Sequence, residues 1–399
     1  MKIAVLLYQP GPNLNPLFQL LGRQKGVDLT VYYRNSLGVK AEYDPAFGVT
    51  VDWGVPVLGG YNYKILRNYF LRPSDQFWGG MNFGIAVEIW RNKFDAILIH
   101  GWNSLANWLA FFTAFLTRTP VFLSSESPLN QEILKSKWKL FIKKIIFGKI
   151  FFPYIAAFLY IGEENRKFYK HYGVPDKKLF FYPYAADNER LMRESNLLKP
   201  SRDKLKKELG FGAESMAIVF VGRLVIQKNP LNLLTAYEKL SQIKNLKSKV
   251  SLVFVGEGIL RPELEKYIKK HNLKNVILAG FQNKINLMKY FAASDVFVLP
   301  SGMGETWGMV VNEAMCFGLP IIISNIVGSG SDLVKNGENG FIISKGDIDK
   351  LAEYLKFLVD NPEKRLSFGK KSLDIIGNYN YEKDVEGILK ALAYIEKND

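Results

Sequence analysis

Two carboxylates eight positions apart, Glu305 and Glu313, lie in the segment with the clearest chemical pattern. The segment Glu305-Thr-Trp-Gly308-Met-Val-Val-Asn-Glu313 follows an apolar run that ends at Pro300-Ser301-Gly302, and its pattern predicts a helix over 305–317. A helix N-terminus offers unpaired N–H groups to a phosphate, and Gly308 lets the backbone approach it closely. In a continuous helix the two carboxylates would lie roughly 12 Å apart along the axis. One could then hold a ribose and the other a sugar on the far side of a diphosphate.

A second loop places two cations where a diphosphate would need them. Gly222-Arg223-Leu-Val-Ile-Gln-Lys228 directly follows the apolar run Ala217–Val221. Ligands of open α/β sheets bind beyond the carboxyl ends of the strands, so Arg223 and Lys228 could neutralise phosphates there. Each feature alone also fits a solvated surface residue. Their order along successive strand–helix units favours a single anion site.

Two α/β halves must position these residues. Apolar runs alternate with helical patterns, which predicts parallel sheets covered by helices on both faces. The strands expected in the second half are Ala217–Val221, Val250–Val255, Val276–Ala279, Val296–Leu299 and Pro320–Ser324. Those expected in the first half are Ile3–Tyr8, Leu29–Tyr33, Ala96–His100, Val121–Ser124 and Ala157–Ile161. The Gly- and Tyr-rich stretch Asp44–Asn68 is expected to be loop, with Trp53 and Tyr61 as core aromatics rather than sugar-stacking surfaces.

Composition limits the classes of protein that need to be considered. A chain of 399 residues, 48% hydrophobic and 23% charged, predicts a folded protein of two domains. The single Cys316 excludes an internal disulfide and is expected to be a buried, inert thiol, and the three scattered histidines indicate no zinc site. The short apolar start is unlike a signal peptide, and no apolar run reaches the length of about 18 residues that a membrane span needs. We therefore expect a cytoplasmic protein.

The order of the motifs resembles the donor domain of the family 4 retaining glycosyltransferases. The residues that carry the resemblance are Gly222-Arg223…Lys228, Val255-Gly256-Glu257-Gly258, Gly280-Phe281, Ser294-Asp295…Pro300-Ser301, Glu305-x7-Glu313, Ala314-Met315…Gly318-Leu-Pro320 and Asn339-Gly340. The resemblance implies a GT-B fold, in which two Rossmann-like, doubly wound domains face each other across a cleft. It implies an acceptor-binding domain at 1–198, a nucleotide-sugar donor domain at 204–380, and a helix at 383–399 that returns to the first domain.

The resemblance also implies roles for individual residues. Arg223 and Lys228 would bind the donor diphosphate, Glu313 the ribose and Glu305 the transferred sugar. The complete set of expected donor-binding residues is Gly11, Arg223, Lys228, Phe281, Gln282, Glu305, Gly308, Met309, Val310 and Glu313. His100 falls where relatives carry a sugar-contacting His or Asp, although a structural role at the strand end is equally open. With His100, the candidate catalytic residues are Glu305, Arg223 and Lys228, and the acceptor-side candidates are Asn13, Trp102, Glu126 and Asp187.

The implied reaction moves a sugar from a nucleotide-diphosphate sugar to a glycan or lipid-linked glycan, as in polysaccharide or glycolipid assembly. The leaving phosphate gains negative charge, which calls for a fixed electrostatic clamp. We expect retention by front-face departure, with no metal or other cofactor, because Asp347-Ile348-Asp349 precedes a helical pattern and is interpreted as an N-cap. Glu126 is a poor candidate for a covalent nucleophile. Alternatives are a nucleotide-sugar epimerase of the same fold and an inactive nucleotide-sugar-binding scaffold subunit.

The net charge of +15 fits a protein that binds an anionic membrane, an acidic substrate or nucleic acid. No nucleic-acid recognition motif is present, so we expect no nucleic-acid partner. Lys135–Ile150 holds six lysines and no acid, with Trp138, Phe141, Ile142, Ile145 and Ile146 at helical spacing. This basic amphipathic helix suits the inner face of the cell membrane. Packing of the stripe on its own sheet, or attraction of an anionic acceptor, are the alternatives.

Overall fold

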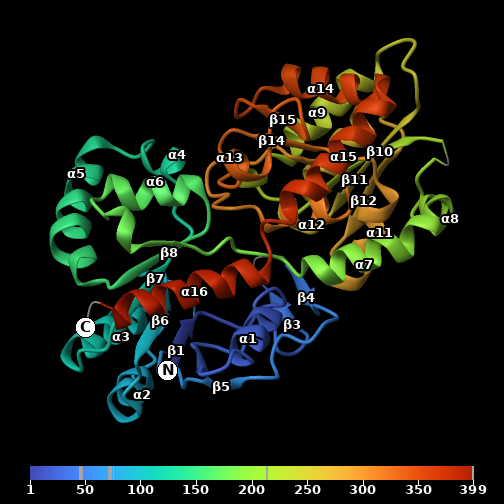
Figure 1. Cartoon of the computed structure of the whole chain (residues 1–399). Helices are drawn as coiled ribbons and strands as arrows, with labels where there is room; N and C mark the ends of the chain where they lie inside the picture. Colours follow the sequence, from blue (N-terminus) through green and yellow to red (C-terminus); the bar gives the residue numbers. More distant parts are fainter. Residues whose placement is uncertain (45–47, 71–73, 75, 213, 398–399) are drawn as a thin grey trace. The chain divides into compact units, whose positions relative to one another are not determined.

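The computed structural model describes residues 1–44, 48–70, 74, 76–212 and 214–397 (Figure 1). Internal contacts divide the chain into two compact units. Unit 1 comprises Met1–Lys40, Val55–Ala185 and Asn380–Asp399, and unit 2 comprises Ala41–Gly54 and Ala186–Tyr379. Each unit holds a parallel sheet with helices packed against it, which confirms the predicted α/β class with two Rossmann-like parallel-sheet domains.

The sheet of unit 1 has seven parallel strands in the order β5-β2-β1-β6-β7-β8-β9. Their bounds are β1 Lys2–Leu7, β2 Asp28–Tyr33, β5 Asn62–Ile65, β6 Ala96–His100, β7 Val121–Ser124, β8 Ala157–Tyr160 and β9 Leu179–Phe181. Five of them match the predicted strands to within one residue at either end. The central strands are buried on both faces, as their continuous apolar runs require.

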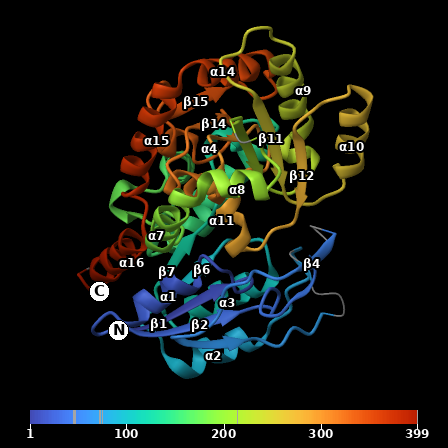
Figure 2. The same cartoon turned by 90° about the vertical axis from the view of Figure 1, so that its right-hand side faces the viewer.

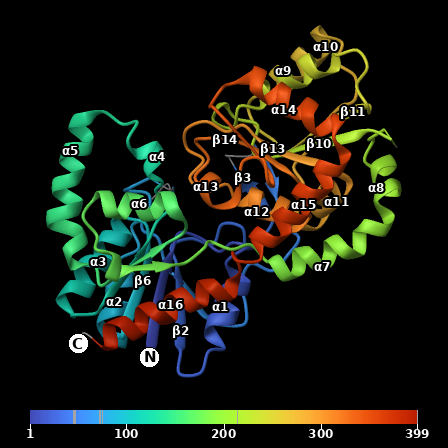
Figure 3. The same cartoon turned by 45° about the horizontal axis from the view of Figure 1, so that its top comes forward.

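Helices cover both faces of this sheet (Figure 3). On one face, α1 (Asn15–Gly22) contacts α16 (Tyr381–Glu396). The core on the other face includes side chains of α2 (Gly84–Asn92), α3 (Leu105–Leu116) and α6 (Glu163–His171). The remaining helical segments are α4 Leu129–Glu132, α5 Lys137–Ile145, the π-helix η1 Ile146–Phe151, and the short 3-10 helices η2 Phe152–Tyr154 and η3 Asp176–Lys178.

The sheet of unit 2 has six parallel strands in the order β12-β11-β10-β13-β14-β15. Their bounds are β10 Met216–Val221, β11 Val250–Val255, β12 Val276–Gly280, β13 Val296–Leu299, β14 Ile321–Ser324 and β15 Gly340–Ile343. All five predicted strands are present. The order places β10 and β13 at the centre of the sheet, so their following loops meet at one edge.

Helices also cover both faces of the unit 2 sheet, with α9 and α14 on one face and α11 and α12 on the other (Figures 1 and 2). The bounds are α7 Asn188–Leu198, η4 Lys199–Ser201, α8 Arg202–Glu208, η5 Ile226–Lys228, α9 Pro230–Ser241, α10 Arg261–Lys270, α11 Lys284–Ala293, α12 Met309–Cys316, α13 Gly330–Leu333, α14 Ile348–Asp360 and α15 Pro362–Ile376. The segment between the expected domains, 199–203, is helical.

We predicted from its composition that the stretch Asp44–Asn68 is loop, and this prediction is wrong in part. The hairpin of β3 (Glu42–Asp44) and β4 (Val49–Val51) extends into it, and β5, which lies within it, pairs in parallel with β2. Residues 45–47 lie outside the described part of the chain. Both strands of the hairpin are only three residues long and β5 is exposed along its length, so no alternation of buried and exposed residues marked them in the sequence. Trp53 and Tyr61 are half-buried, not full core residues.

The last helix, α16, begins at Tyr381, two residues before the predicted start, and residues 398–399 lie outside the described part of the chain. The Asp384 carboxylate accepts the backbone N–H groups of Tyr184 and Ala185 at 3.1 and 3.2 Å. The Tyr381 hydroxyl donates to the carbonyl of Asn13 at 2.7 Å. The C-terminal helix is therefore an integral part of unit 1. Within the described residues, no helix combines the length and the hydropathy that a membrane crossing demands.

Candidate functional site

Backbone hydrogen bonds join the loops at the carboxyl edge of the unit 2 sheet. The N–H of Gly222 donates to Val255 O at 3.0 Å, and the N–H of Gly256 donates to Gly280 O at 2.9 Å. A Cβ on Gly256 would lie 2.0 Å from Gly222 O, so only glycine fits where the loops after β10 and β11 meet. The Gly256-Glu257-Gly258 motif therefore allows the backbones of these two loops to pack closely together.

Lys228 and Glu305 form a largely enclosed ion pair at this edge. The Lys228 ammonium contacts Glu305 Oε2, and the Ser301 hydroxyl donates to the same oxygen at 2.9 Å. Their side chains are 19% and 9% exposed. The pair joins two of the predicted site residues that lie 77 positions apart. Arg223, five residues before Lys228, is exposed.

Glu313 is the most deeply buried acidic residue of the predicted set. Its side chain is 2% exposed, and Oε1 is paired with the ammonium of Lys284, which is 14% exposed. Oε2 has no hydrogen-bond partner among the described residues. A buried carboxylate oxygen without a donor is costly, and vicinal hydroxyls are the donors that a carboxylate accepts well. Lys284 was missed by our sequence reasoning, because nothing in the pattern links two residues 29 positions apart.

The helix that carries Glu313 begins later than we predicted. We expected a helix over 305–317, whereas α12 starts at Met309. The carbonyls of Glu305 and Trp307 accept N–H groups from Gly328 and Ser329, at 3.1 and 3.2 Å, and so cannot serve the helix. Gly308 forms the N-cap at φ +89°, a left-handed conformation that suits glycine. The estimate of roughly 12 Å between the carboxylates therefore loses its basis, while an N-terminus with free N–H groups at Met309 and Val310 remains.

The loop that holds the expected donor-binding residues Phe281 and Gln282 is packed against a segment from the first part of the chain. The rings of Phe281 and Trp53 lie 6.2 Å apart in a T-shaped contact, and the N–H of Lys284 donates to Trp53 O at 3.0 Å. Gln282 turns its amide to Ala279 O at 2.9 Å. Both aromatic residues belong to unit 2, since Ala41–Gly54 packs there. No sequence pattern predicted this association.

In unit 1, His100 and Glu126 line a cavity of about 290 Å³ at the carboxyl ends of the strands. His100 Nε2 lies 3.7 Å from Glu126 Oε1. Ser124 also lines the cavity, and its buried hydroxyl has no partner among the described residues. Burial, with the charge of Glu126 and a hydrogen bond to it, raises the pKa of the Tyr184 hydroxyl well above its usual range. Tyr184 therefore stays protonated beside Glu126, in a cavity lined by polar groups able to bind hydroxyls.

The other predicted residues in the first half and at the unit boundary have structural contacts. The Trp102 ring stacks on Phe168 at 6.0 Å and packs on the core of unit 1. Asp187 caps α7 by accepting the N–H of Arg190. Gly11 and Asn13 lie in the loop after β1. Unit 1 thus holds Gly11, Asn13, His100, Trp102 and Glu126, and unit 2 holds Asp187, Arg223, Lys228, Phe281, Gln282, Glu305, Gly308, Met309, Val310 and Glu313.

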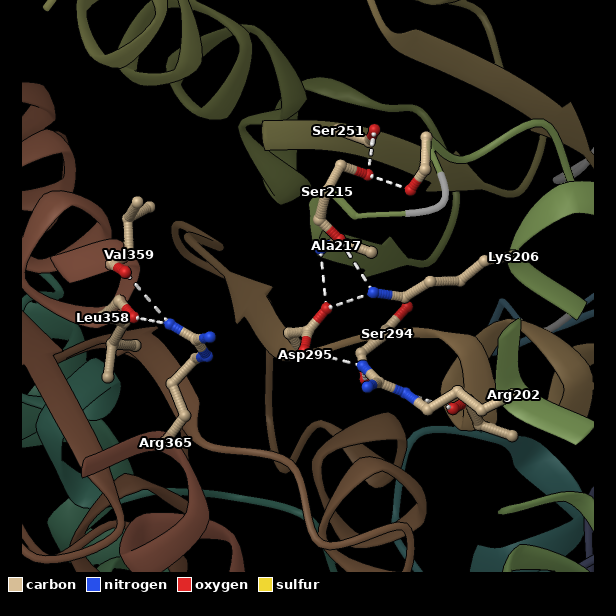
Figure 4. A network of polar contacts seen from close by, with 12 residues as sticks. Arg202, Lys206, Ser215, Ala217, Ser251, Ser294, Asp295, Leu358, Val359 and Arg365 are labelled. Carbon is tan, nitrogen blue, oxygen red and sulfur yellow. Dashed lines mark hydrogen bonds and ion pairs between the residues drawn. The ribbon is translucent and has the colours of Figure 1, made fainter. Parts of the chain in front are cut away.

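Asp295 of the Ser294-Asp295 motif lies at the start of β13, the edge of the sheet opposite to the site, and anchors α8 (Figure 4). Its carboxylate pairs with Arg202 at 2.6 Å and Lys206 at 3.1 Å and accepts the N–H of Ala217 at 2.8 Å. Burial alone raises the pKa of Asp295, but the two cations and the N–H outweigh it and hold the pKa below its usual range. The role of this motif residue is therefore structural.

Two smaller predictions are confirmed. The Asp347 side chain accepts the N–H of Lys350 at 2.9 Å and caps α14, as its position before a helical pattern predicted. Cys316 is buried, and burial raises the pKa of its thiol well above the usual range. Within the described residues, no three His, Cys, Asp or Glu side chains cluster in a way that could hold a metal ion.

Comparisons with known proteins bear on the fold and on the segment that forms most of unit 2. Residues 201–375, within unit 2, match the family model described as glycosyl transferases group 1. The crystal structure of Anabaena Alr3699/HepE in complex with UDP and glucose matches with a TM-score of 0.71 and 18% identity, covering 98% of this chain and 99% of that one. The chain has the GT-B fold. The segment matched by the family model, residues 201–375, contains the Lys228–Glu305 and Lys284–Glu313 ion pairs.

Curated relatives match a part of the GT-B chain. The UDP-Gal:alpha-D-GlcNAc-diphosphoundecaprenol alpha-1,3-galactosyltransferase of Escherichia coli is 34% identical over 230 residues, 57% of this chain and 57% of that protein. Spore coat protein SA of Bacillus subtilis (strain 168) is 33% identical over 215 residues, 52% of this chain and 55% of that protein. The chain thus spans little more than half the length of these relatives.

Proposed function

We propose that the chain is a glycosyltransferase that holds a nucleotide-diphosphate sugar in unit 2 and transfers the sugar to a glycan or lipid-linked glycan held by unit 1. The observation that carries the proposal is the buried Glu313 carboxylate, which has one oxygen on Lys284 and the other unpartnered. It lies one turn into α12, whose N-terminus offers N–H groups for a phosphate. A nucleoside diphosphate offers both partners, a ribose diol for the Glu313 carboxylate and a diphosphate for the helix N-terminus.

The charged residues of unit 2 then act on the leaving group. As the bond from the anomeric carbon to the phosphate breaks, negative charge grows on the diphosphate. Arg223 and the ammonium of Lys228 stabilise that charge, and Glu305 orients Lys228 while it accepts a hydroxyl of the sugar. A positioned cation of this kind lowers the barrier only if it binds the departing phosphate more tightly than the intact donor.

We propose that the reaction proceeds with retention and without a metal. The departing phosphate takes the proton of the acceptor hydroxyl on the same face of the sugar, so no carboxylate beneath the ring is needed. In unit 1, the His100–Glu126 pair binds acceptor hydroxyls inside the cavity that it lines. The UDP named with the Anabaena structure makes uracil the first base to try.

The test is thermal stabilisation by UDP, GDP and ADP and their sugars, with and without EDTA. A ligand that binds the native state raises the melting temperature by mass action. The most effective nucleotide should lose its effect on Glu313→Gln and Arg223→Ala and keep it on the exposed control Glu353→Gln. No stabilisation by any nucleotide would contradict the proposed donor site. Stabilisation without transfer to any acceptor would favour the inactive scaffold, and turnover of the donor sugar without an acceptor would favour the epimerase. The anomeric configuration of the product, measured by NMR, decides retention.

A further inference from the structure

Helix α5 of unit 1 carries an apolar stripe that its own domain does not cover. None of its residues is buried, and Trp138 and Phe141 are 62% and 65% exposed. An amphipathic helix on a globular domain ordinarily turns such a stripe to the core. Packing of this stripe on the sheet of unit 1, one of the alternatives considered from the sequence, is therefore wrong.

The uncovered apolar surface continues beyond both ends of α5. Ile133 and Leu134 precede the helix, Ile150 and Tyr154 follow it, and all four are exposed. Tyr154 also contacts Phe115 on the exposed side of α3, with ring centroids 5.4 Å apart. We call residues 133–154, with the exposed apolar side chains of α3, the α5 surface. Figures 1 and 3 show α5 at the margin of unit 1. Continuous apolar exposure of this kind marks an interaction site.

One of the six lysines of this segment fastens α5 to the core. The Lys143 ammonium pairs with Glu132 at 2.6 Å and lies over the ring of Phe147 at 5.1 Å from its centroid. Burial lowers the pKa of Lys143 in spite of its pairing with Glu132. This anchored lysine explains how α5 is held in place while its stripe stays outside.

Of the other five lysines, Lys135 pairs with Glu132 at 2.7 Å, and the remaining four lie free beside the stripe. Lys137, Lys139, Lys144 and Lys149 are exposed, and none of them has an acidic partner within the described part of the chain. No acidic residue occurs in Lys135–Ile150 to offset their charge. Such lysines lay their stems on apolar surface while the ammonium groups reach outward to anions.

We propose that the α5 surface docks this protein on the anionic face of a lipid bilayer. Helix α5 lies in the plane of the headgroups, Trp138 and Phe141 enter the boundary with the acyl chains, and the free lysines meet lipid phosphates. A protein partner fits the surface less well, because lysine is depleted from the cores of protein interfaces whereas here it alternates with apolar residues. The inference stands independently of the transferase reaction.

The test measures co-sedimentation of the full chain with vesicles of phosphatidylcholine alone and of phosphatidylcholine with phosphatidylglycerol in a two-to-one ratio. We expect binding to the anionic vesicles and much weaker binding to the neutral ones. The triple variant Lys137→Gln/Lys139→Gln/Lys144→Gln should lower the partition coefficient about 100-fold, since each lysine at an anionic surface contributes roughly a factor of five. Trp138→Ala/Phe141→Ala should weaken binding to both kinds of vesicle.

A matched control removes the same charge from unit 2. Lys266→Gln/Lys269→Gln/Lys270→Gln on the exposed side of α10 should leave vesicle binding unchanged. Melting curves verify that all variants fold, which the exposure of the substituted residues leads us to expect. The proposal is overturned if the wild type ignores anionic vesicles, or if the α10 variant loses as much binding as the α5 variant. It is also overturned if Trp138→Ala/Phe141→Ala instead dissolves a dimer seen by light scattering.

Discussion

Removal of the ammonium of Lys284 should expose how strongly the site depends on its buried charges. In Lys284→Met, Glu313 keeps its place at 2% exposure but loses the partner of Oε1, while Oε2 already has none. Breaking a buried ion pair by removing one partner costs about 3–5 kcal/mol. We expect a loss of that size in the free energy of unfolding of unit 2.

The double variant Lys284→Met/Glu313→Met separates stability from function. Replacing both charges with apolar side chains of similar size is often neutral, so stability should return to within about 1 kcal/mol of the wild type. Nucleotide binding should not return, because the carboxylate that we assign to the ribose is gone. A lost hydrogen bond to a charged group is worth about 1.5–3 kcal/mol, or roughly 10- to 150-fold in Kd.

The assay is urea unfolding combined with hydrogen exchange of peptides from α12, because the two units need not unfold together. The matched control is Lys239→Met, which removes an exposed pair with Asp349 and should cost less than about 1 kcal/mol. The reasoning is refuted if Lys284→Met costs no more than Lys239→Met. It is equally refuted if the double variant is as unstable as the single one.

Three further predictions concern other parts of unit 2. Asp295→Asn should cost about 3 kcal/mol at neutral pH, because it leaves the buried Lys206 uncompensated. The pKa of Asp295 is lower in the folded state than in the unfolded state, so its contribution to the free energy of unfolding is present above the unfolded pKa of about 3.9 and is lost as pH falls through the folded pKa. Urea midpoints of the variant should therefore vary less below about pH 4 than those of the wild type. Gly308→Ala should lower the melting temperature, because φ is +89° and the new Cβ would lie 3.2 Å from Leu299 Cδ2. Trp53→Ala should weaken nucleotide binding about 2- to 10-fold in a titration, the worth of one aromatic contact.

Each of these has an outcome that contradicts it. Parallel pH profiles for Asp295→Asn and the wild type would show that the carboxylate is not held ionised by its neighbours. Gly304→Ala, at φ +96° with open space around it, carries the strain without the crowding and should be the milder change. If the two alanines cost the same, crowding at Gly308 is not significant. Trp78→Ala, at an exposed tryptophan of unit 1, should leave nucleotide affinity unchanged.

The sequence predicted the elements whose burial is uniform. The central strands of both sheets are covered on both faces, so their continuous apolar runs identified them. The start of α12 was misplaced, because the carbonyls of Glu305 and Trp307 are engaged by a loop more than 20 positions away. Local patterns contain no information about such a partner.

The sequence nominated candidate site residues but could not predict which of them form ion pairs. Arg223, Lys228, Glu305 and Glu313 could be chosen from their spacing after successive strands, whereas the partnership of Lys284 with Glu313 depends on how two helices pack. The association of the segment Ala41–Gly54 with unit 2 depends on tertiary contacts alone. The amphipathic pattern of α5 was visible, but a stripe that faces the core and one that faces solvent have the same periodicity.

The return of α16 to unit 1 has a consequence for the order of events on the ribosome. Helix α16 packs so closely on β9 that a Cβ on Gly387 would lie 2.0 Å from Phe181 O. The part of that face that α16 covers stays exposed until residues 381–396 have left the exit tunnel, after the whole of unit 2 has emerged. The half of the chain that is synthesised first therefore completes its fold last. During translation its apolar sheet is an obvious substrate for chaperones.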